Sequence, residues 1–349
     1  MRELVMIITD LYLPQAEAPG AALEAVPGIE LVGRFGARCA LADGWRPWLA
    51  RWLGHEELAQ AAPASIAAAP LTVPAGAAAE GAATPAATRW IATPVELVAG
   101  LSSVHLGQRG IVRLALPERM ALCDAFARTF GGSGLKLWPL SGGDFLMETP
   151  GIEPLATPEP ARCLGAQLAA YLPRGTAAPA LLRLASEIEM WLHGEPLNAS
   201  RRARGVQPVT QLWLWGSAGG PVPARPPAEP AADLAFGDDA YLAGLWHLQG
   251  AACRELPRQL EPLLEQGSAV RAVLSVEAGG ELLHGESAWR LDAALAALDR
   301  RFVSPALRAL EAGMLGRLLV VANDTCVSLT RLSTLKRWRL RRAPLAPFA

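Results

Sequence analysis

Short apolar runs and helical spacings alternate along the chain. Residues 4–8 form an apolar run that predicts a first strand. Trp45, Trp48, Leu49 and Trp52 recur at intervals of three and four residues, which predicts a helix with the tryptophans on one face. Further strands are predicted at 90–97, 135–140, 145–147, 208–216, 269–276, 317–322 and 325–330, and further helices after Pro117 and at 159–171, 179–193, 239–248, 287–298 and 304–312.

This alternation of strands and helices predicts an α/β protein with a mainly parallel central sheet and an antiparallel edge. The apolar run 208–216 predicts a central strand that is buried on both faces. Residues 1–349 are expected to form one α/β domain, with 89–178 as a candidate inserted subdomain. Two segments rich in Ala and Pro, 61–88 and 217–230, lack periodicity and predict flexible linkers.

Composition excludes several classes of protein. With 51% hydrophobic and 19% charged residues among 349, the chain can bury a large core, unlike a disordered or fibrous protein. The formal net charge of -1 gives no overall attraction to nucleic acid, so no specific nucleic-acid partner is expected. No run of about 18 apolar residues predicts a transmembrane segment. The five cysteines are scattered, which argues against a disulfide framework or a zinc ribbon and favours a cytoplasmic location.

The segment 195–208 is the most unusual local sequence, because four groups able to hold an anion lie close together in it. We expect it to be a loop that binds substrate or an anion through Asn198, Arg201, Arg204 and Gly205. Guanidinium groups suit phosphate and carboxylate, and glycine lets the backbone approach a ligand closely. The alternative is structural: Arg201 or Arg204 pairs with a glutamate of the preceding helix, Glu187 or Glu189.

The same segment resembles a known family. Asn198-x-x-Arg201-x-x-x-Gly205-x-x-Pro208, followed by Leu212-Trp213-Leu214-Trp215-Gly216, is similar to a signature of archaeal-type, cofactor-independent phosphoglycerate mutases. Those enzymes belong to the alkaline phosphatase superfamily. The resemblance is closer to proteobacterial phosphoglycerate mutase-like proteins that include regulatory proteins of the Rpf type. It implies a three-layer, alkaline-phosphatase-like fold in reduced form.

This chain departs from the family at the positions that would carry catalysis. The family uses two divalent metals held by Asp and His, an Asp-Gly-x-Gly-Asp start and a Ser or Thr nucleophile. Here no Gly-x-Gly-Asp follows Asp10, Glu195 stands in place of the signature's His, and Thr210 stands in place of its Asn. No catalytic residue and no cofactor is therefore predicted. Mn²⁺ or Mg²⁺ belongs only to an active-enzyme alternative, with scattered ligands such as Asp10, His284 and Asp324.

The end of the chain gathers positive charge around a tryptophan. This tail is a candidate site for a polyanion or an acidic membrane surface, and the alternative is a solvated terminal helix or edge strand. The residues that would bind the polyanion are Lys336, Arg337, Arg339, Arg341 and Arg342.

These observations rank three hypotheses. The first is a catalytically degenerate, phosphoglycerate mutase-like protein that acts as a regulatory or ligand-binding protein. Its partner would be a small phosphorylated or carboxylated ligand, or another protein. The second is an active metal-dependent mutase or phosphatase, and the third is an interaction module that uses the basic tail.

Overall fold

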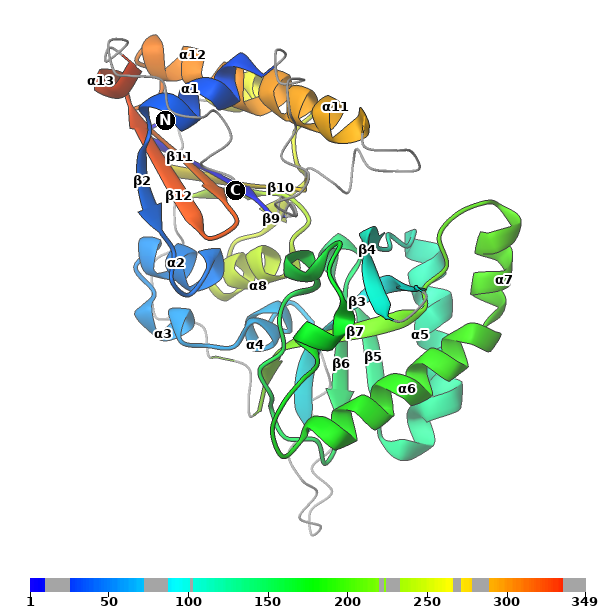
Figure 1. The fold of residues 1–349 in the computed structure, drawn as a ribbon. Helices are drawn as coiled ribbons and strands as arrows, with labels where there is room; N and C mark the ends of the chain where they lie inside the picture. The colour runs from blue at the N-terminus through cyan, green and yellow to red at the C-terminus, as the bar shows by residue number, and fades with distance from the viewer. Residues whose placement is uncertain are drawn as a thin grey trace. The chain divides into compact units, whose positions relative to one another are not determined.

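The computed structural model describes residues 1–9, 26–71, 87–100, 103–219, 223, 233–265, 271–277 and 289–334 (Figure 1). Contacts divide the chain into two compact units. The first unit contains Met1–Ala59, Pro227–Asp238 and Gln249–Ala349, and the second contains Gln60–Pro226 and Asp239–Leu248. The candidate inserted subdomain 89–178 lies within the second unit, where its first strand pairs with residues 211–218 beyond it.

The first unit is built on a seven-stranded, mainly parallel sheet. Its strands are β1 (Glu3–Ile8), β2 (Ala37–Ala40), β8 (Leu234–Phe236), β9 (Cys253–Arg254), β10 (Arg271–Val276), β11 (Arg317–Ala322) and β12 (Thr325–Thr330), in the order β2-β12-β11-β1-β10-β8-β9. Among the described strands, the pairs β11–β12 and β12–β2 are antiparallel, and the other pairs of this sheet are parallel. The predicted α/β class, with a parallel sheet and an antiparallel edge, is confirmed in this unit.

The first unit also contains helices and helical turns. They are α1 (Pro27–Phe35), α2 (Trp45–Trp52), α3 (Glu56–Ala59), α9 (Glu261–Glu265), α11 (Trp289–Leu298), the π-helical turn η7 (Asp299–Val303), α12 (Ser304–Glu311) and α13 (Arg331–Thr334). Alternate residues of β1, from Leu4 to Ile8, share one core with side chains of α1, α11 and α12. The residues between them, Val5 and Ile7, are also fully buried. Both faces of this central strand are therefore covered, as an all-apolar strand requires.

The second unit contains a separate, antiparallel sheet. Its strands are β3 (Thr88–Ala99), β4 (Val104–Ile111), β5 (Lys136–Pro139), β6 (Phe145–Thr149) and β7 (Gln211–Ala218). The long strand β3 pairs with β4 and β6 and also with β7, and β5 pairs with β6 in the predicted hairpin. The run 208–216 therefore contributes an antiparallel strand of this smaller sheet, which corrects its expected place in the parallel sheet.

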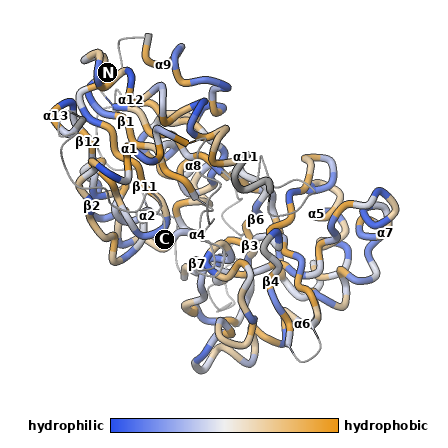
Figure 2. The backbone as a smooth tube through the Cα atoms, turned by 45° about the horizontal axis from the view of Figure 1, so that its top comes forward, coloured by the Kyte–Doolittle hydropathy of each residue, from blue (hydrophilic) through white to orange (hydrophobic). Residues whose placement is uncertain are grey.

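Alternation along β7 explains why the sequence shows a continuous apolar run. Leu212 and Leu214 join the core under the helices α5 (Leu116–Phe130) and α6 (Ala178–Gly194). Trp213 and Trp215 point to the opposite core. That core includes α4 (Pro63–Ala67), α8 (Ala240–Leu248) and the 3-10 turns η5 (Pro160–Cys163) and η6 (Leu168–Tyr171). Both faces of β7 are buried, as predicted. The remaining elements of the unit are η3 (Gly131–Ser133), η4 (Ser141–Gly143) and α7 (Pro196–Ala203). Figure 2 shows apolar residues recurring along the backbone in both units.

Two local predictions are wrong. The expected helix at 159–171 is two short 3-10 turns, because Gly165 between them has a φ of 74°, which a continuous helix does not allow. The expected linker 61–88 begins with the packed helix α4, in which Ala64, Ile66 and Ala67 are buried. Most of the remainder of that segment, and most of 217–230, lies outside the described residues. Within the described ranges, no helix combines the length and apolar character needed to cross a bilayer.

Candidate functional site

The Arg201 segment is a helix rather than a loop. Pro196 occupies the first turn of α7, where its missing N–H has no partner to lose. Asn198 and Arg201, one helical turn apart, both turn inward and are 1% and 5% exposed. Gly205 follows the helix with a φ of 69°, a conformation that glycine adopts without a steric penalty. The four predicted site residues are therefore close together, as the spacing implied, but two of them are buried.

Asn198 links three parts of the second unit through its amide. Its Nδ2 donates to the carbonyl of Leu192 at 2.6 Å and to that of Val209 at 2.7 Å, and its Oδ1 accepts from the Val209 N–H at 2.8 Å. Both donors and the acceptor are thus engaged, as a buried amide requires. The side chain holds the end of α6 and the residues before β7 together.

Arg201 binds a glutamate that the sequence analysis did not consider. Its Nη1 lies 3.0 and 2.8 Å from the two carboxylate oxygens of Glu118 on α5. Nε donates to the Gln207 carbonyl at 2.6 Å, and Nη2 lies 3.4 Å from the Arg113 carbonyl. Arg204, with a side chain 55% exposed, donates to the same Glu118 at 2.7 Å.

Glu118 is the centre of this arrangement, which we call the Glu118 clamp (Glu118, Arg201 and Arg204). Burial acts to raise the pKa of Glu118, but the N–H of Ala115 and the two guanidinium groups outweigh it and lower the pKa overall. Glu118 also caps α5 by accepting the Ala115 N–H at 3.0 Å. Arg201 therefore forms a structural ion pair, as the alternative in the sequence analysis allowed. Its partner is Glu118, and not Glu187 or Glu189. Both of those glutamates are exposed.

The other positions of the signature also make structural contacts. Thr210, which stands in place of an asparagine, accepts the Leu97 N–H at 2.7 Å and lies 3.3 Å from the Val95 carbonyl. It therefore secures β7 against β3. Among the described residues, apart from Gly205 and its two neighbours in the chain, no atom comes within 4 Å of the position that a Cβ on Gly205 would take, so the surface there is open.

The residues suggested as metal ligands do not form a cluster in the part of the chain that the structure describes. Asp324 lies in the turn between β11 and β12, whereas Asp10 and His284 fall outside the described residues. Among the described residues, no three His, Cys, Asp or Glu side chains converge in a way that could hold a metal ion. The basic tail, from Lys336 to Arg342, also lies outside them.

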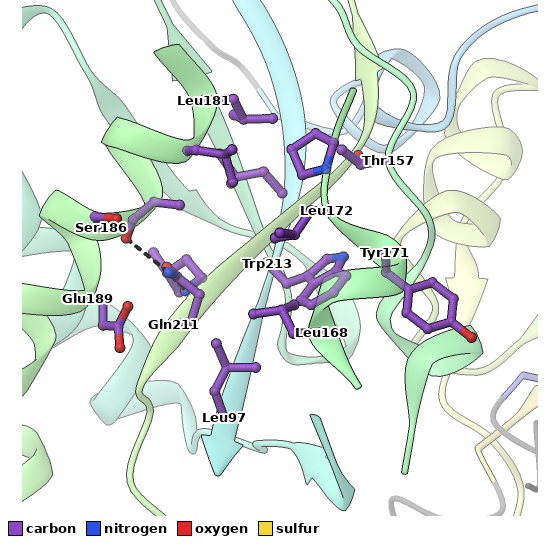
Figure 3. Close-up of a pocket in the computed structure, with 15 residues that line it drawn as sticks. Leu97, Thr157, Leu168, Tyr171, Leu172, Leu181, Ser186, Glu189, Gln211 and Trp213 are labelled. Atoms are coloured by element: carbon purple, nitrogen blue, oxygen red, sulfur yellow. Dashed lines mark hydrogen bonds between the residues drawn. The ribbon is translucent and has the colours of Figure 1, made fainter. Parts of the chain in front are cut away.

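The second unit contains a pocket of about 230 Å³ that the sequence did not reveal (Figure 3). Its walls come from β3, η6, α6 and β7, and most of its lining is apolar: Leu97, Leu168, Leu172, Pro173, Leu181, Leu182, Ala185, Leu212, Trp213 and Leu214. The indole N–H of Trp213 donates to the Pro158 carbonyl at 2.8 Å, which fixes the ring in the wall. Leu97 and Leu168 belong to the same apolar cluster as this ring, and Figure 3 shows all three among the residues that line the pocket.

Five polar residues complete the lining: Thr157, Tyr171, Ser186, Glu189 and Gln211. Gln211 donates to the Ala185 carbonyl at 2.9 Å, the dashed contact of Figure 3, so its amide is already engaged. Thr157 Oγ1 is buried and has no hydrogen-bond partner among the described residues. Glu189 is the one charged side chain of the lining. The pocket therefore combines an apolar wall with a few polar residues and one carboxylate, and its lining contains no Lys, Arg or His to pair with an anion.

Comparison with known proteins shows limited similarity. No family model and no curated protein sequence matches the chain. Among solved structures, a cofactor-independent phosphoglycerate mutase from Thermoplasma acidophilum DSM 1728 is 14% identical, with a TM-score of 0.39 over 95% of this chain and 90% of that one. The PH0037 protein from Pyrococcus horikoshii is 13% identical, with a TM-score of 0.45 over 91% of this chain and 81% of that one.

Proposed function

We propose that this protein is a catalytically degenerate, phosphoglycerate mutase-like protein that binds a ligand in a regulatory role. The resemblance rests on the signature around Asn198 and Arg201. The observation that carries the proposal is the use of these two side chains: both are buried and form hydrogen bonds within the protein. A group that must bind the substrate phosphate cannot also remain in a buried ion pair with Glu118. The signature therefore serves as a structural clamp in this chain.

We further propose that the pocket of the second unit is the ligand site. A cavity of this kind, apolar with a few polar groups, is the usual form of a small-molecule site. Its ligand is a small apolar molecule that carries a hydrogen-bond donor or acceptor and no negative charge. A negative charge would lie near Glu189 without a cation from the lining to offset it, which is costly in an apolar pocket.

The sequence also predicts that an anion binds at the Arg201 segment, and this prediction is separate from the pocket. It would use the exposed part of Arg204 and the open surface at Gly205.

The first test is catalysis. The full chain is assayed for 3-phosphoglycerate mutase and phosphomonoesterase activity with added Mn²⁺ or Mg²⁺, beside Arg204→Ala, a change at a side chain that is 55% exposed. We expect no activity in either protein. Metal-dependent activity that falls in Arg204→Ala would overturn the degenerate assignment and would make the clamp a substrate site.

The second test is binding to the pocket. The probe is N-phenyl-1-naphthylamine, an uncharged apolar amine whose fluorescence rises in an apolar site. Ala185→Trp fills the pocket from α6, and Met190→Trp is the matched control on the same helix, at a position 69% exposed and outside the lining. We expect Ala185→Trp to abolish the fluorescence increase and Met190→Trp to retain it. Equal binding by both variants would overturn the pocket assignment. Binding of 3-phosphoglycerate, measured by calorimetry, tests the anionic prediction separately.

A further inference from the structure

Two cysteines that are far apart in the sequence face each other at the edge of the first unit's sheet. In the antiparallel pair of β2 and β12, Cys39 lies directly opposite Cys326. Both are free thiols; Cys39 is exposed, whereas Cys326 is buried. Side chains of directly opposed residues in an antiparallel pair lie on the same face of the sheet and next to each other. The two sulfur atoms therefore occupy neighbouring positions.

The register also gives the backbone spacing that a disulfide needs. The N–H of Leu41 donates to the Asp324 carbonyl at 2.7 Å, which makes Leu41 and Asp324 a hydrogen-bonded pair. Such pairs alternate along an antiparallel ladder, so Cys39 and Cys326, two positions along, form another hydrogen-bonded pair with a Cα–Cα distance of about 5.5 Å. Disulfides have Cα–Cα distances of about 4.4–6.8 Å.

We propose that Cys39 and Cys326 form a reversible disulfide that joins the edge strand β2 to β12 under oxidising conditions. The Cβ atoms of opposed residues are about 4.5–5.5 Å apart, and a disulfide brings them to about 3.5–4.5 Å. Because a hydrogen-bonded pair lies at the wider end of the first range, the strands must close by about 1–2 Å. β2 can make this movement because it is four residues long and, among the described strands, pairs with β12 alone.

The difference in burial between Cys39 and Cys326 determines which thiol reacts first. The exposed thiolate of Cys39 attacks hydrogen peroxide, the O–O bond breaks, and sulfenic acid and hydroxide form. The Cys326 sulfur then attacks the sulfenic sulfur, the S–O bond breaks, and water leaves with the proton of Cys326. In sum, two thiols and one peroxide give one disulfide and two waters. Burial, with the charge of Cys39 as a smaller cause, raises the pKa of Cys326 to about 11, so Cys326 is not suited to the first step.

Such a bond would connect α1 and β2, near the start of the chain, to a strand near its end. Disulfides that close long loops restrict the unfolded chain, so the oxidised protein should be the more stable form. In a reducing compartment the bond would be transient and would report oxidation.

The test uses the full chain, treated with hydrogen peroxide, blocked with iodoacetamide and digested without reduction. We expect a linked pair of peptides that contain Cys39 and Cys326, a loss of two hydrogens in mass, and a rise in Tm that dithiothreitol reverses. Cys39→Ser, a change at an exposed position, should abolish all three effects. Cys123→Ser, at a buried cysteine in the second unit, is the control and should retain them.

Two outcomes would overturn the proposal. One is recovery of Cys39 and Cys326 as separately alkylated peptides after oxidation. The other is accumulation of sulfinic acid at Cys39 in place of the linked peptides, which would show that Cys326 does not reach the sulfenic sulfur.

Discussion

Asp144 shows how burial changes the chemistry of one residue. Its Oδ1 has no hydrogen-bond partner among the described residues. Burial raises the pKa of Asp144 to about 6, aided by the charges of Asp239 and Glu159 and opposed by Arg113 and a hydrogen bond with Thr93. The folded protein therefore favours the protonated carboxyl group more than the unfolded chain does, since the ordinary value is 3.8.

Asp144→Asn should remove a dependence of stability on pH. Because the folded pKa is the higher one, the stabilisation by protonated Asp144 is complete below about pH 4 and is lost as the pH rises through about 6. We expect the variant to be more stable than the parent at neutral pH, by on the order of 2 kcal/mol, and equal to it at about pH 4. Urea unfolding at both pH values measures this. Asp124→Asn, at an exposed position, is the control. The same difference between Asp144→Asn and the parent at both pH values would contradict the prediction.

At the scale of elements, the Glu118 clamp joins α5 to α7. The buried arginine and the exposed arginine bind one carboxylate, but their surroundings differ. The Arg201 side chain is 6% exposed and that of Arg204 is 55% exposed. Breaking a buried pair leaves a charge without its partner, whereas an exposed pair is largely replaced by water.

Arg201→Met should therefore destabilise the protein far more than Arg204→Ala. We expect a loss of about 3 kcal/mol for the first and less than about 1 kcal/mol for the second. Because the folded pKa of Glu118 is lowered, the contribution of the clamp is present above about pH 4.5 and is lost as the pH falls through the folded value. The midpoint of urea unfolding measures both effects. Similar losses in the two variants would show that the clamp is not the source of stability.

At the scale of the whole molecule, each unit has its own sheet and its own core. In the first unit, buried Asp299 accepts the N–H groups of Gly28 and Ile29 at the start of α1 and the hydroxyl of Ser304. A Cβ on Gly28 would come within 2.3 Å of this carboxylate, so glycine is required there. Asp299 thus connects η7 to α1 and α12 in the first unit, as Glu118 connects α5 to α7 in the second.

Variants in the two units should act locally. We expect Asp299→Ala to speed amide hydrogen exchange in peptides of the first unit, and Arg201→Met to speed it in peptides of the second, because each removes buried hydrogen bonds within one core. Hydrogen exchange followed by mass spectrometry separates the two sets of peptides. Equal acceleration in both units by either variant would show that the chain unfolds as one cooperative body.

The sequence by itself determined most of the elements and the α/β class. Strands such as 4–8 and 317–322 and the helix 45–52 were predicted correctly. Their burial follows a periodic pattern of apolar residues that can be read from the sequence. It also indicated that Asn198 and Arg201 act together, because they are close together in one segment, but it predicted a loop where the structure has the helix α7. It did not show the short turns around Gly165, where a single φ value ends a helix.

Only the tertiary structure decided which distant residues meet. The partner of Arg201 is Glu118 on another helix, the pocket takes its wall from four elements, and Cys39 meets Cys326 through the pairing of two edge strands. It also decided that β7 pairs with β3 and not with the parallel sheet, because an apolar strand suits either environment. These contacts depend on topology, and local patterns of hydrophobicity carry no information about which strand or helix becomes a neighbour.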